Sequence, residues 1–297
     1  MKAYRHMFPI ERMACVLEVS SSGYYAWLGR EVSLRERERE RYDLRVRQLF
    51  EQNKQRCGYR RIHLLLVRQG VPCAQKRVQA SMQRQGLRAR PRCKYVVTTQ
   101  SKHGHPVAPN LLERNFTATK PNQVWTTDIT YIRGKLGWLY LVVFLDLYSR
   151  AIVGWKVSTN LRAAFVVETF VRAAKRRRIT AGLLVHSDRG VQYCCSDFRD
   201  VIKAHGASQS MSRKGDCWDN AVTESFFSTL KKEMPAEMVF ANQAAAERYL
   251  FEYIEVEYNC QRLHSTLGYR PPMEYEEQTV CARPAAQRSK KVRDVCG

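Results

Sequence analysis

Three strand-like runs follow one another between residues 123 and 158, and the segments that join them are very short. In "QVWTTDITYI" polar and apolar residues alternate, so Val124, Thr126, Asp128 and Thr130 share one face of a strand. "GWLYLVVFLD" is a continuous apolar run, as in a central strand, and "RAIVGWKVS" is the third run. The connections "RGKLG" and "LYS" are short enough to predict antiparallel hairpins.

Helix and strand patterns alternate after residue 160. A helix is predicted from about residue 161, then a strand at 183–185, a helix at 197–205, the strand "SQSM" and a helix at 220–232 with Asp219 as its cap. The expected buried stripe of the first of these helices is Ala163, Val166, Val167, Phe170, Val171 and Ala174. This order predicts an α/β fold, a mixed sheet flanked by helices.

Two acids lie on strands that have no basic residue inside them. Asp128 falls within the first strand, and Asp188 follows the fourth strand in "LLVHSDRGVQY". If these strands are neighbours, two close carboxylates repel each other, and one must stay protonated unless a cation joins them. A hard divalent cation would resolve the conflict.

A third acid is available on the helix "DNAVTESFFSTLKKE". Its core face is expected to be Val222, Phe226 and Leu230, while a different side carries Asn220, Glu224, Phe227 and Lys231. Carboxylates on two strands and a helix suit two Mg²⁺ ions roughly 4 Å apart, which could serve an in-line phosphoryl displacement, and Mn²⁺ could substitute. Taken singly, each acid could instead be a turn, cap or surface residue.

The N-terminal half has helical patterns. Residues 10–27 contain two short helices with Ser20 or Ser21 as a cap, and "SLRERERERYDLRVRQLFEQ" is a charged helix that could be a solvated spacer or could bind a partner. Residues 57–92 contain two helices, ended by Gly70 and Gly86. This module is either a DNA-binding helix-turn-helix or an ordinary basic hairpin, with Val78 and Met82 facing inward. The candidate DNA contacts are Arg60, Arg61, Lys76, Arg77 and Arg84.

Charge points to a polyanionic partner. The chain has 50 Lys and Arg against 28 Asp and Glu, a formal charge of +22, and residues 61–110 hold ten basic residues and no acid. Nucleic acid is the simplest partner, although a merely basic protein would share this composition. The ten cysteines form no CxxC pair, and Cys93 with His103 and His105 would be only half a zinc site. With no signal sequence or membrane span, a cytoplasmic, nucleoid-associated protein is expected.

These patterns divide the chain into five segments. They are an N-terminal helical region at 1–52, a basic helix-turn-helix DNA-binding domain at 53–100, a linker at 101–115, a catalytic domain at 116–282 and a basic tail at 283–297.

Thirty-five residues separate Asp188 from Glu224. This spacing resembles the D,D(35)E signature of retroviral integrases and insertion-sequence transposases, and the chain is most similar to the OrfB-type transposases of two-frame insertion sequences. The similarity extends through "SSGYYAW", "YRRIHLLL", "NQVWTTDITYI", "GWLYLVVFLDLYSRAIVGW", "VHSDRGVQY", "DNAVTESFFSTLKKE" and "YNCQRLHSTLGYRPP". It implies an RNase H-like catalytic domain, Mg²⁺-dependent strand transfer on double-stranded DNA at terminal repeats and target, fusion to an upstream-frame partner, and a homo-oligomer on DNA.

Under this resemblance Asp128, Asp188 and Glu224 would be the catalytic, metal-holding triad, and Asp146 would be structural or would support the metal ligands. Arg189, Lys231 and Lys232 would contact DNA phosphates, whereas His186 could contact phosphate or be a core histidine. The tail residues Asn259, Arg262 and His264 are expected to cover or line the site. The competing functions are a metal-dependent endonuclease or resolvase of the same fold, and a DNA-binding regulator with idle acids.

Overall fold

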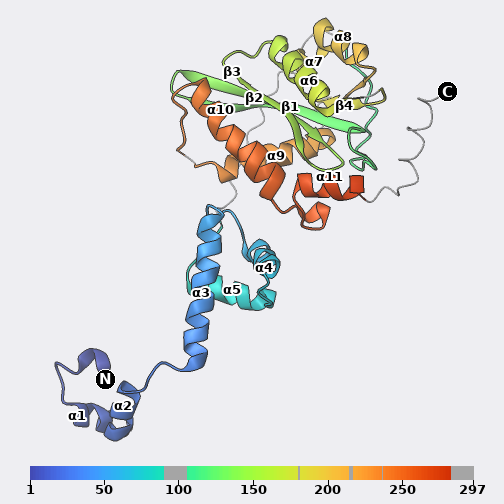
Figure 1. The fold of residues 1–297 in the computed structure, drawn as a ribbon. Helices are drawn as coiled ribbons and strands as arrows, with labels where there is room; N and C mark the ends of the chain where they lie inside the picture. Colours follow the sequence, from blue (N-terminus) through green and yellow to red (C-terminus); the bar gives the residue numbers. More distant parts are fainter. Residues whose placement is uncertain (90–105, 180, 214–216, 236, 282–297) are drawn as a thin grey trace. The chain divides into compact units, whose positions relative to one another are not determined.

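The computed structural model describes residues 1–89, 106–179, 181–213, 217–235 and 237–281. The chain divides into two compact units, Met1–Arg90 and Pro91–Gly297 (Figure 1). Within the described residues, every helix is too short or too polar to cross a membrane.

The first unit begins with small helices. The 3₁₀ turn η1 (Lys2–Tyr4) precedes α1 (Ile10–Val16) and α2 (Ser21–Leu28). Ser20 caps α2, because its Oγ accepts the N–H of Gly23 at 3.1 Å, as the sequence predicted. This helix pair buries only Ala14 and Tyr24 among its apolar residues.

Three longer helices form the core of the first unit: α3 (Leu34–Gln52), α4 (Tyr59–Arg68) and α5 (Gln75–Arg84). Gly70 and Gly86, with φ of +75° and +65°, follow α4 and α5 as predicted. The core residues are Tyr42, Val46, Leu49, Phe50, Ile62, Leu66, Val78 and Met82. The C-terminal half of α3 is therefore more than a solvated spacer, and the boundary expected after residue 52 divides helices that share one core.

The second unit is built on a five-stranded mixed sheet in the order β3-β2-β1-β4-β5. The long strands β1 (Val124–Gly134), β2 (Gly137–Asp146) and β3 (Ile152–Ser158) are antiparallel, as their short connections predicted. The short strands β4 (Leu184–Ser187) and β5 (Ser208–Met211) extend the sheet parallel to β1. The predicted mixed α/β fold is confirmed, and β1 lies at its centre.

Helices cover both faces of this sheet (Figure 1). One layer holds α6 (Ala163–Arg177), α7 (Val191–Cys194) and α8 (Ser196–Ala204), packed around Trp125, Phe144 and Phe170. The other layer holds α9 and the tail helices, packed around Leu141, Val143 and Phe227. Its members are η2 (Cys217–Asn220), α9 (Ala221–Glu233), α10 (Gln243–Phe251), the π-helix η3 (Glu252–Gln261), η4 (Ser265–Leu267) and α11 (Pro272–Cys281).

Part of the predicted linker belongs to the second unit. Residues 101–105 lie outside the described residues, but Ala108 packs against the sheet domain and the carbonyl of Pro109 accepts the N–H of Met211. Leu112 is buried in the same cluster as Phe240, and the N–H groups of Leu111 and Leu112 donate to Ser210 Oγ at 2.9 and 3.2 Å. The expectation of a linker to residue 115 is wrong for this half, because apolar burial and hydrogen bonds fix it.

The packing of α6 on β3 depends on a glycine. Val166, Phe170 and Ala174 are buried as predicted, but Val171 is exposed, and Phe165 and Ala173 take its place in the core. The helix approaches β3 so closely that a methyl group added at Gly154 would lie 2.6 Å from Cβ of Ala173. The buried face of α6 is therefore rotated, relative to the predicted one, toward the contact between Ala173 and Gly154.

We expect Gly154→Ala to lower the free energy of unfolding of the second unit by about 1–3 kcal/mol, because the added methyl overpacks the contact with α6. Chemical denaturation measures the loss. Adding Ala173→Gly removes the opposing methyl, so the double variant should be more stable than the sum of the two single effects, although Gly costs helix propensity. Simple additivity would contradict this account of the contact.

Candidate active site

The parallel pairing of β1 with β4 brings two acids together. The register aligns Thr127 with Ser187 at the carboxyl end of β4, so Asp128 and Asp188 continue the two chains side by side. Asp128 is buried, and its Oδ1 accepts the N–H of Ile129 at 2.7 Å. Asp188 Oδ1 accepts the N–H of Gly190 at 2.9 Å. The expectation that these strands are neighbours is confirmed.

Helix α9 is attached to the same part of β1. Thr223 Oγ1 donates to Thr126 Oγ1 at 2.7 Å, and Asn220 Nδ2 donates to the carbonyl of Thr127 at 3.2 Å. Thr126 and Asp128 share one face of β1, as predicted, and that face is covered by α9. These bonds fix the first turn of the helix, from which Glu224 projects.

The electrostatics show that the three carboxylates are near one another. Burial, followed by the charge of Asp188 and then that of Glu224, raises the pKa of Asp128 well above its usual value. Burial and Asp188 also raise the pKa of Glu224. Each carboxylate thus makes ionisation of its neighbours more costly.

Two further groups lie close to these acids. Lys231 is partly buried, which lowers its pKa, while the nearby Asp128 acts in the opposite direction. Tyr193, which sequence analysis missed, is fully buried, with its hydroxyl 3.2 Å from Thr127 Oγ1. Burial, Asp128 and Asp188 raise the pKa of Tyr193 well above its usual value. A neutral phenol therefore lies close to the two acids. The sequence "VQYC" gives no sign of this, because an ordinary buried tyrosine would look the same.

The three carboxylates fit a divalent cation in their chemistry. They supply only oxygen ligands, which Mg²⁺ prefers, and a cation would offset both the burial and the mutual repulsion that raise the pKa of Asp128. Within the described ranges, no group of three or more His, Cys, Asp and Glu side chains forms a ready-made metal site. Ligation by all three would therefore need a rearrangement of side chains, and Glu224 is partly exposed.

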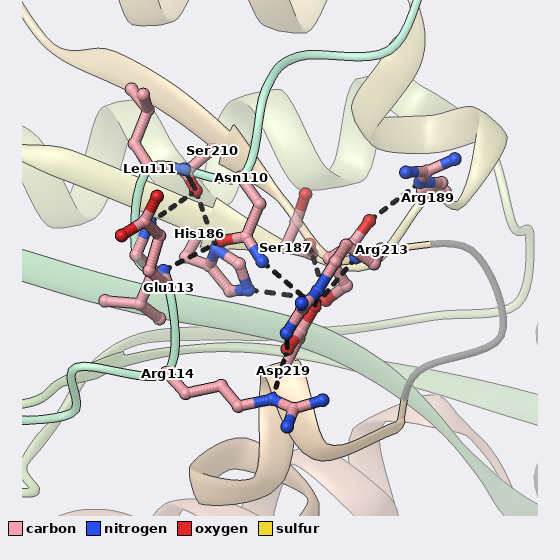
Figure 2. Close-up of polar contacts among 12 residues, drawn as sticks. Asn110, Leu111, Glu113, Arg114, His186, Ser187, Arg189, Ser210, Arg213 and Asp219 are labelled. Atoms are coloured by element: carbon pink, nitrogen blue, oxygen red, sulfur yellow. Dashed lines mark hydrogen bonds and ion pairs between the residues drawn. The ribbon is translucent and has the colours of Figure 1, made fainter.

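Asp219, which directly precedes the first turn of α9, is the centre of a network of polar contacts. Figure 2 shows this network. The carboxylate of Asp219 accepts Asn110 Nδ2 at 2.9 Å, Arg114 Nε at 2.8 Å and both the backbone N–H and Nε of Arg213 at 2.8 and 3.1 Å. Hydrogen bonds from Arg213 hold the pKa of Asp219 far below its usual value. The predicted capping role is wrong, because Asn220 is the N-cap residue of α9 and Asp219 joins segments distant in sequence.

His186 is a core histidine. It has no exposed surface, its Nδ1 lies 2.8 Å from Ser210 Oγ, and its Nε2 lies 3.3 Å from Ser212 Oγ (Figure 2). Burial lowers the pKa of His186 to about 4, so the ring is neutral near pH 7. Two roles were expected for His186, a contact with phosphate or a place in the core. The first is therefore wrong, and the second is confirmed. Arg189, next to Asp188, donates from Nε to the carbonyl of Ser212 at 2.7 Å.

The tail residues support the scaffold. Asn259 bonds both the N–H and the carbonyl of Ile152, at 2.9 and 3.0 Å, and Arg262 pairs with Glu233 at the end of α9. His264 packs against Tyr258. These contacts give Asn259 and Arg262 structural partners in β3 and α9, and that the three tail residues cover or line the acidic site stays a prediction.

Two assignments about buried residues had different outcomes. Asp146 is structural, as predicted, because it is fully buried and accepts hydrogen bonds from the N–H groups of Asn122 and Tyr148 and from Arg177. Phe227 was placed on the side of Glu224 and Lys231, but it is fully buried in the core.

Two of the expected DNA contacts of the first unit lie against α3. Arg84 makes a bidentate pair with Asp43, at 3.1 and 2.6 Å, and the guanidinium of Arg77 lies 4.2 Å from the ring centre of Tyr42. Both residues therefore have intramolecular roles that the sequence did not indicate. Arg60 lies over the ring of Tyr59, and Lys76 is exposed on α5.

Comparisons with known proteins agree with this architecture. Residues 118–217 and 205–272 match two family models of an integrase core domain, and residues 36–95 match an HTH-like domain. The last match begins inside α3, in agreement with the shared core. The transposase InsF for insertion sequence IS3A of Escherichia coli K12 is 42% identical over 275 residues, which cover 92% of this chain and 96% of that protein.

Two other proteins are similar over much of their length. An uncharacterized 31 kDa protein of insertion element IS600 from Shigella sonnei is 39% identical over 266 residues, 90% of this chain and 98% of that one. Among solved structures, a chain of the simian T-cell lymphotropic virus intasome, in complex with PP2A regulatory subunit B56 gamma, is 13% identical. It has a TM-score of 0.45 and covers 77% of this chain and 73% of that chain.

Asp219→Asn should lower the free energy of unfolding of the second unit by about 2 kcal/mol at pH 7, less than for a fully buried ion pair because both arginines are about half exposed. The pKa of Asp219 is depressed in the folded state. Its stabilisation is therefore complete above the unfolded value of about 3.9 and decreases as pH falls below it.

Denaturation of both proteins between acidic and neutral pH measures this difference. The gap between wild type and Asp219→Asn should close as pH falls below about 4. Asp200→Asn, which removes an exposed acid of α8, is the matched control and should show no such gap. If the difference in free energy of unfolding between wild type and Asp219→Asn stays the same at acidic pH, the charge of Asp219 is not what stabilises the network.

Proposed function

Because the chain belongs to the family of insertion-sequence transposases with an integrase core domain, we propose that Asp128, Asp188 and Glu224 are its catalytic residues. The observation that carries this proposal is the parallel pairing of β1 with β4, which places the buried Asp128 beside Asp188, while the bond from Thr223 to Thr126 holds the turn of α9 that carries Glu224 on the same strand. Such buried, mutually repelling acids are common at functional sites. As a DDE-type enzyme, the transposase would use them to cut DNA at the element ends and to join those ends to a target.

The same three residues would hold two Mg²⁺ ions, for which Mn²⁺ could substitute. Bound there, the ions would activate a water or 3′-hydroxyl and stabilise the leaving 3′-oxygen. The protein's own contribution is positional. Asp128 is oriented by the N–H of Ile129, Asp188 by that of Gly190, and Glu224 by the attachment of α9 to β1.

Basic residues near the acids would hold the DNA backbone. Lys231 lies two turns along α9 from Glu224, about 10 Å, and interacts with Asp128. We assign Lys231, Lys232 and Arg189 to phosphates of the reacting strand, with Arg60, Arg61 and Lys76 of the first unit on double-stranded DNA of the terminal repeats. These contacts position the DNA and take no part in proton transfer.

The first helices support a protein partner. Tyr25 and Trp27 of α2 are more than half exposed, and Val16 of α1 is 81% exposed. Such apolar surface on a pair of small helices is typical of a surface that another polypeptide covers. We therefore propose that this region contacts an upstream-frame partner, to which the chain would be fused. We also propose that the enzyme acts on DNA as a homo-oligomer, in the cytoplasm and at the nucleoid.

The triad assignment predicts that Asp128→Asn, Asp188→Asn and Glu224→Gln each reduce cleavage and strand transfer by about 10³-fold or more, because each removes a charge that holds the metal. Binding to element ends should change by less than about two-fold, since no phosphate contact is lost. Asp200→Asn is the matched control and should keep activity. Strand transfer from a pre-cut 3′-hydroxyl end, with end binding, measures both effects. Any triad variant that retains strand transfer would exclude that residue.

The pairing of Arg84 predicts different effects for two cations of α5. Arg84→Ala should lower the stability of the first unit by about 0.5–1 kcal/mol, because it leaves Asp43 without its bidentate partner. Lys76→Ala should leave stability unchanged and lower the salt slope of end binding by about one, as expected for one phosphate contact. Thermal melting and salt titrations of the two variants test this. The assignment fails if Arg84→Ala reduces the slope as much as Lys76→Ala and leaves the melt unchanged.

A further inference from the structure

A groove with a cavity volume of about 820 Å³ runs along the outer edge of the sheet, away from the acids. Strand β3 forms its floor, and α6 and the α10–η3 helices form its two walls. β3 is an edge strand, separated from β1 by β2, whereas the carboxylates belong to β1, the end of β4 and α9. The groove therefore has no part in the active site described above.

Positive charge dominates the lining. Five basic residues face two acids, Glu247 and Glu255, and the basic ones are Lys156, Arg172, Lys175, Arg176 and Arg248. Two of the five are neutralised, since Lys156 pairs with Glu168 and Arg176 makes two bonds of 3.1 Å to Glu255.

Among the described residues, three cations of the lining remain without an ion pair, because the second acid, Glu247, accepts a hydrogen bond from Gln243 Nε2. Arg172, Lys175 and Arg248 are exposed and make no ion pair with any residue in the described part of the chain. Arg172 and Lys175 are three residues apart on α6, so they lie about one turn apart on the same wall. Arg248 belongs to α10 on the opposite wall. A ligand in the groove would meet positive charge from both sides.

The edge of β3 is poorly suited to an added peptide strand. Asn259 occupies the N–H and carbonyl of Ile152 at one end, and Gln243 Nε2 donates to the carbonyl of Val157 at the other. Strand addition needs a continuous row of unpaired backbone groups, and these amides interrupt it.

The lining is also poorly suited to a protein interface. Among the lining residues, Phe251 is the one large apolar side chain that is strongly exposed. Trp155 is partly buried, and its indole N–H donates to Glu255. The centres of protein–protein interfaces are depleted of lysine and acidic residues, whereas interfaces with DNA are more polar and more positive. The charge and the composition both favour a polyanion.

We propose that this groove binds the phosphodiester backbone of duplex DNA, with Arg172, Lys175 and Arg248 as the phosphate contacts. The proposal rests on the proposed function, because it takes DNA to be the molecule on which the chain acts. The groove supplies a second DNA contact on the catalytic unit, at the β3 edge of the sheet. Because these three side chains would meet phosphates, the contact is independent of base sequence.

The test compares two triple variants of the full-length chain that remove the same charge. One is Arg172→Gln, Lys175→Gln and Arg248→Gln. The control is Lys135→Gln, Arg199→Gln and Lys203→Gln, which are also exposed, make no ion pair in the described residues and lie outside the groove. Affinity for a duplex of arbitrary sequence is measured by fluorescence anisotropy over a range of salt concentrations, with EDTA present so that no chemistry occurs. Thermal melting checks that both proteins fold.

The groove variant should lower the salt slope by about 2–3, because each lost phosphate contact removes roughly 0.9 from it, and should weaken binding by about ten-fold or more at low salt. The control should shift affinity by less than about two-fold and leave the slope unchanged. Equal weakening by the two variants would overturn the proposal, because it would show only a long-range effect of net charge.

Two further results would also overturn it. If the groove variant changes the oligomeric state in light scattering and leaves DNA affinity unchanged, the groove binds protein. If tripolyphosphate at matched ionic strength raises the melting temperature of the control but not of the groove variant, while both variants bind the duplex with the same affinity and salt slope, the groove holds a small polyphosphate. The binding assay involves no metal or catalysis, so its failure is distinct from a failure of the triad, which strand transfer reports.

Discussion

The catalytic unit depends on one pairing, the parallel alignment of β4 with β1. It places Asp128 and Asp188 side by side, in a position where burial and like charge both oppose ionisation. Parallel strands cannot be joined by a tight turn, so α6 has to carry the chain across the sheet between β3 and β4. The close packing of α6 on Gly154 is thus part of what keeps the acids together.

The helix that carries Glu224 is held at both ends by buried acids. Before its first turn Asp219 binds Arg114 and Arg213, and in its last turn Glu233 binds Arg262 and Tyr253. Each acid joins α9 to a segment distant in sequence, and hydrogen bonds from Thr223 and Asn220 fix its rotation on β1. The helix cannot slide or turn without breaking charged contacts, so Glu224 is placed by the scaffold while its own side chain keeps some freedom.

Local pattern was sufficient to predict the strands and the order in which strands and helices follow one another, and it marked Asp128 and Asp188 as acids that would meet if their strands were neighbours. Hairpin-short connections left few alternatives for β1 to β3, and an acid at the end of an apolar run could be recognised without knowing its partner. The errors concern pairings over long separations. Asp219 looked like a helix cap because its partners Asn110 and Arg114 lie more than a hundred residues away. Similarly, nothing near Arg84 in the sequence indicates that Asp43 neutralises it.

Pairing over long separations also makes net charge alone a poor guide to DNA contacts in this chain. Arg84, Arg177 and Arg262 all add to the formal charge of +22, yet each is bound to a carboxylate of its own unit and stabilises the fold. Attraction at long range follows the total charge, whereas a defined contact needs a cation that the fold has positioned and left without a counter-charge. In the groove along β3, Lys156 and Arg176 fail this criterion, and Arg172, Lys175 and Arg248 meet it. Because the groove and the carboxylates are parts of one hydrogen-bonded sheet, a backbone held at β3 would lie at a fixed distance from the acids at β1. The sheet that brings the acids together would then also set which stretch of the duplex reaches them.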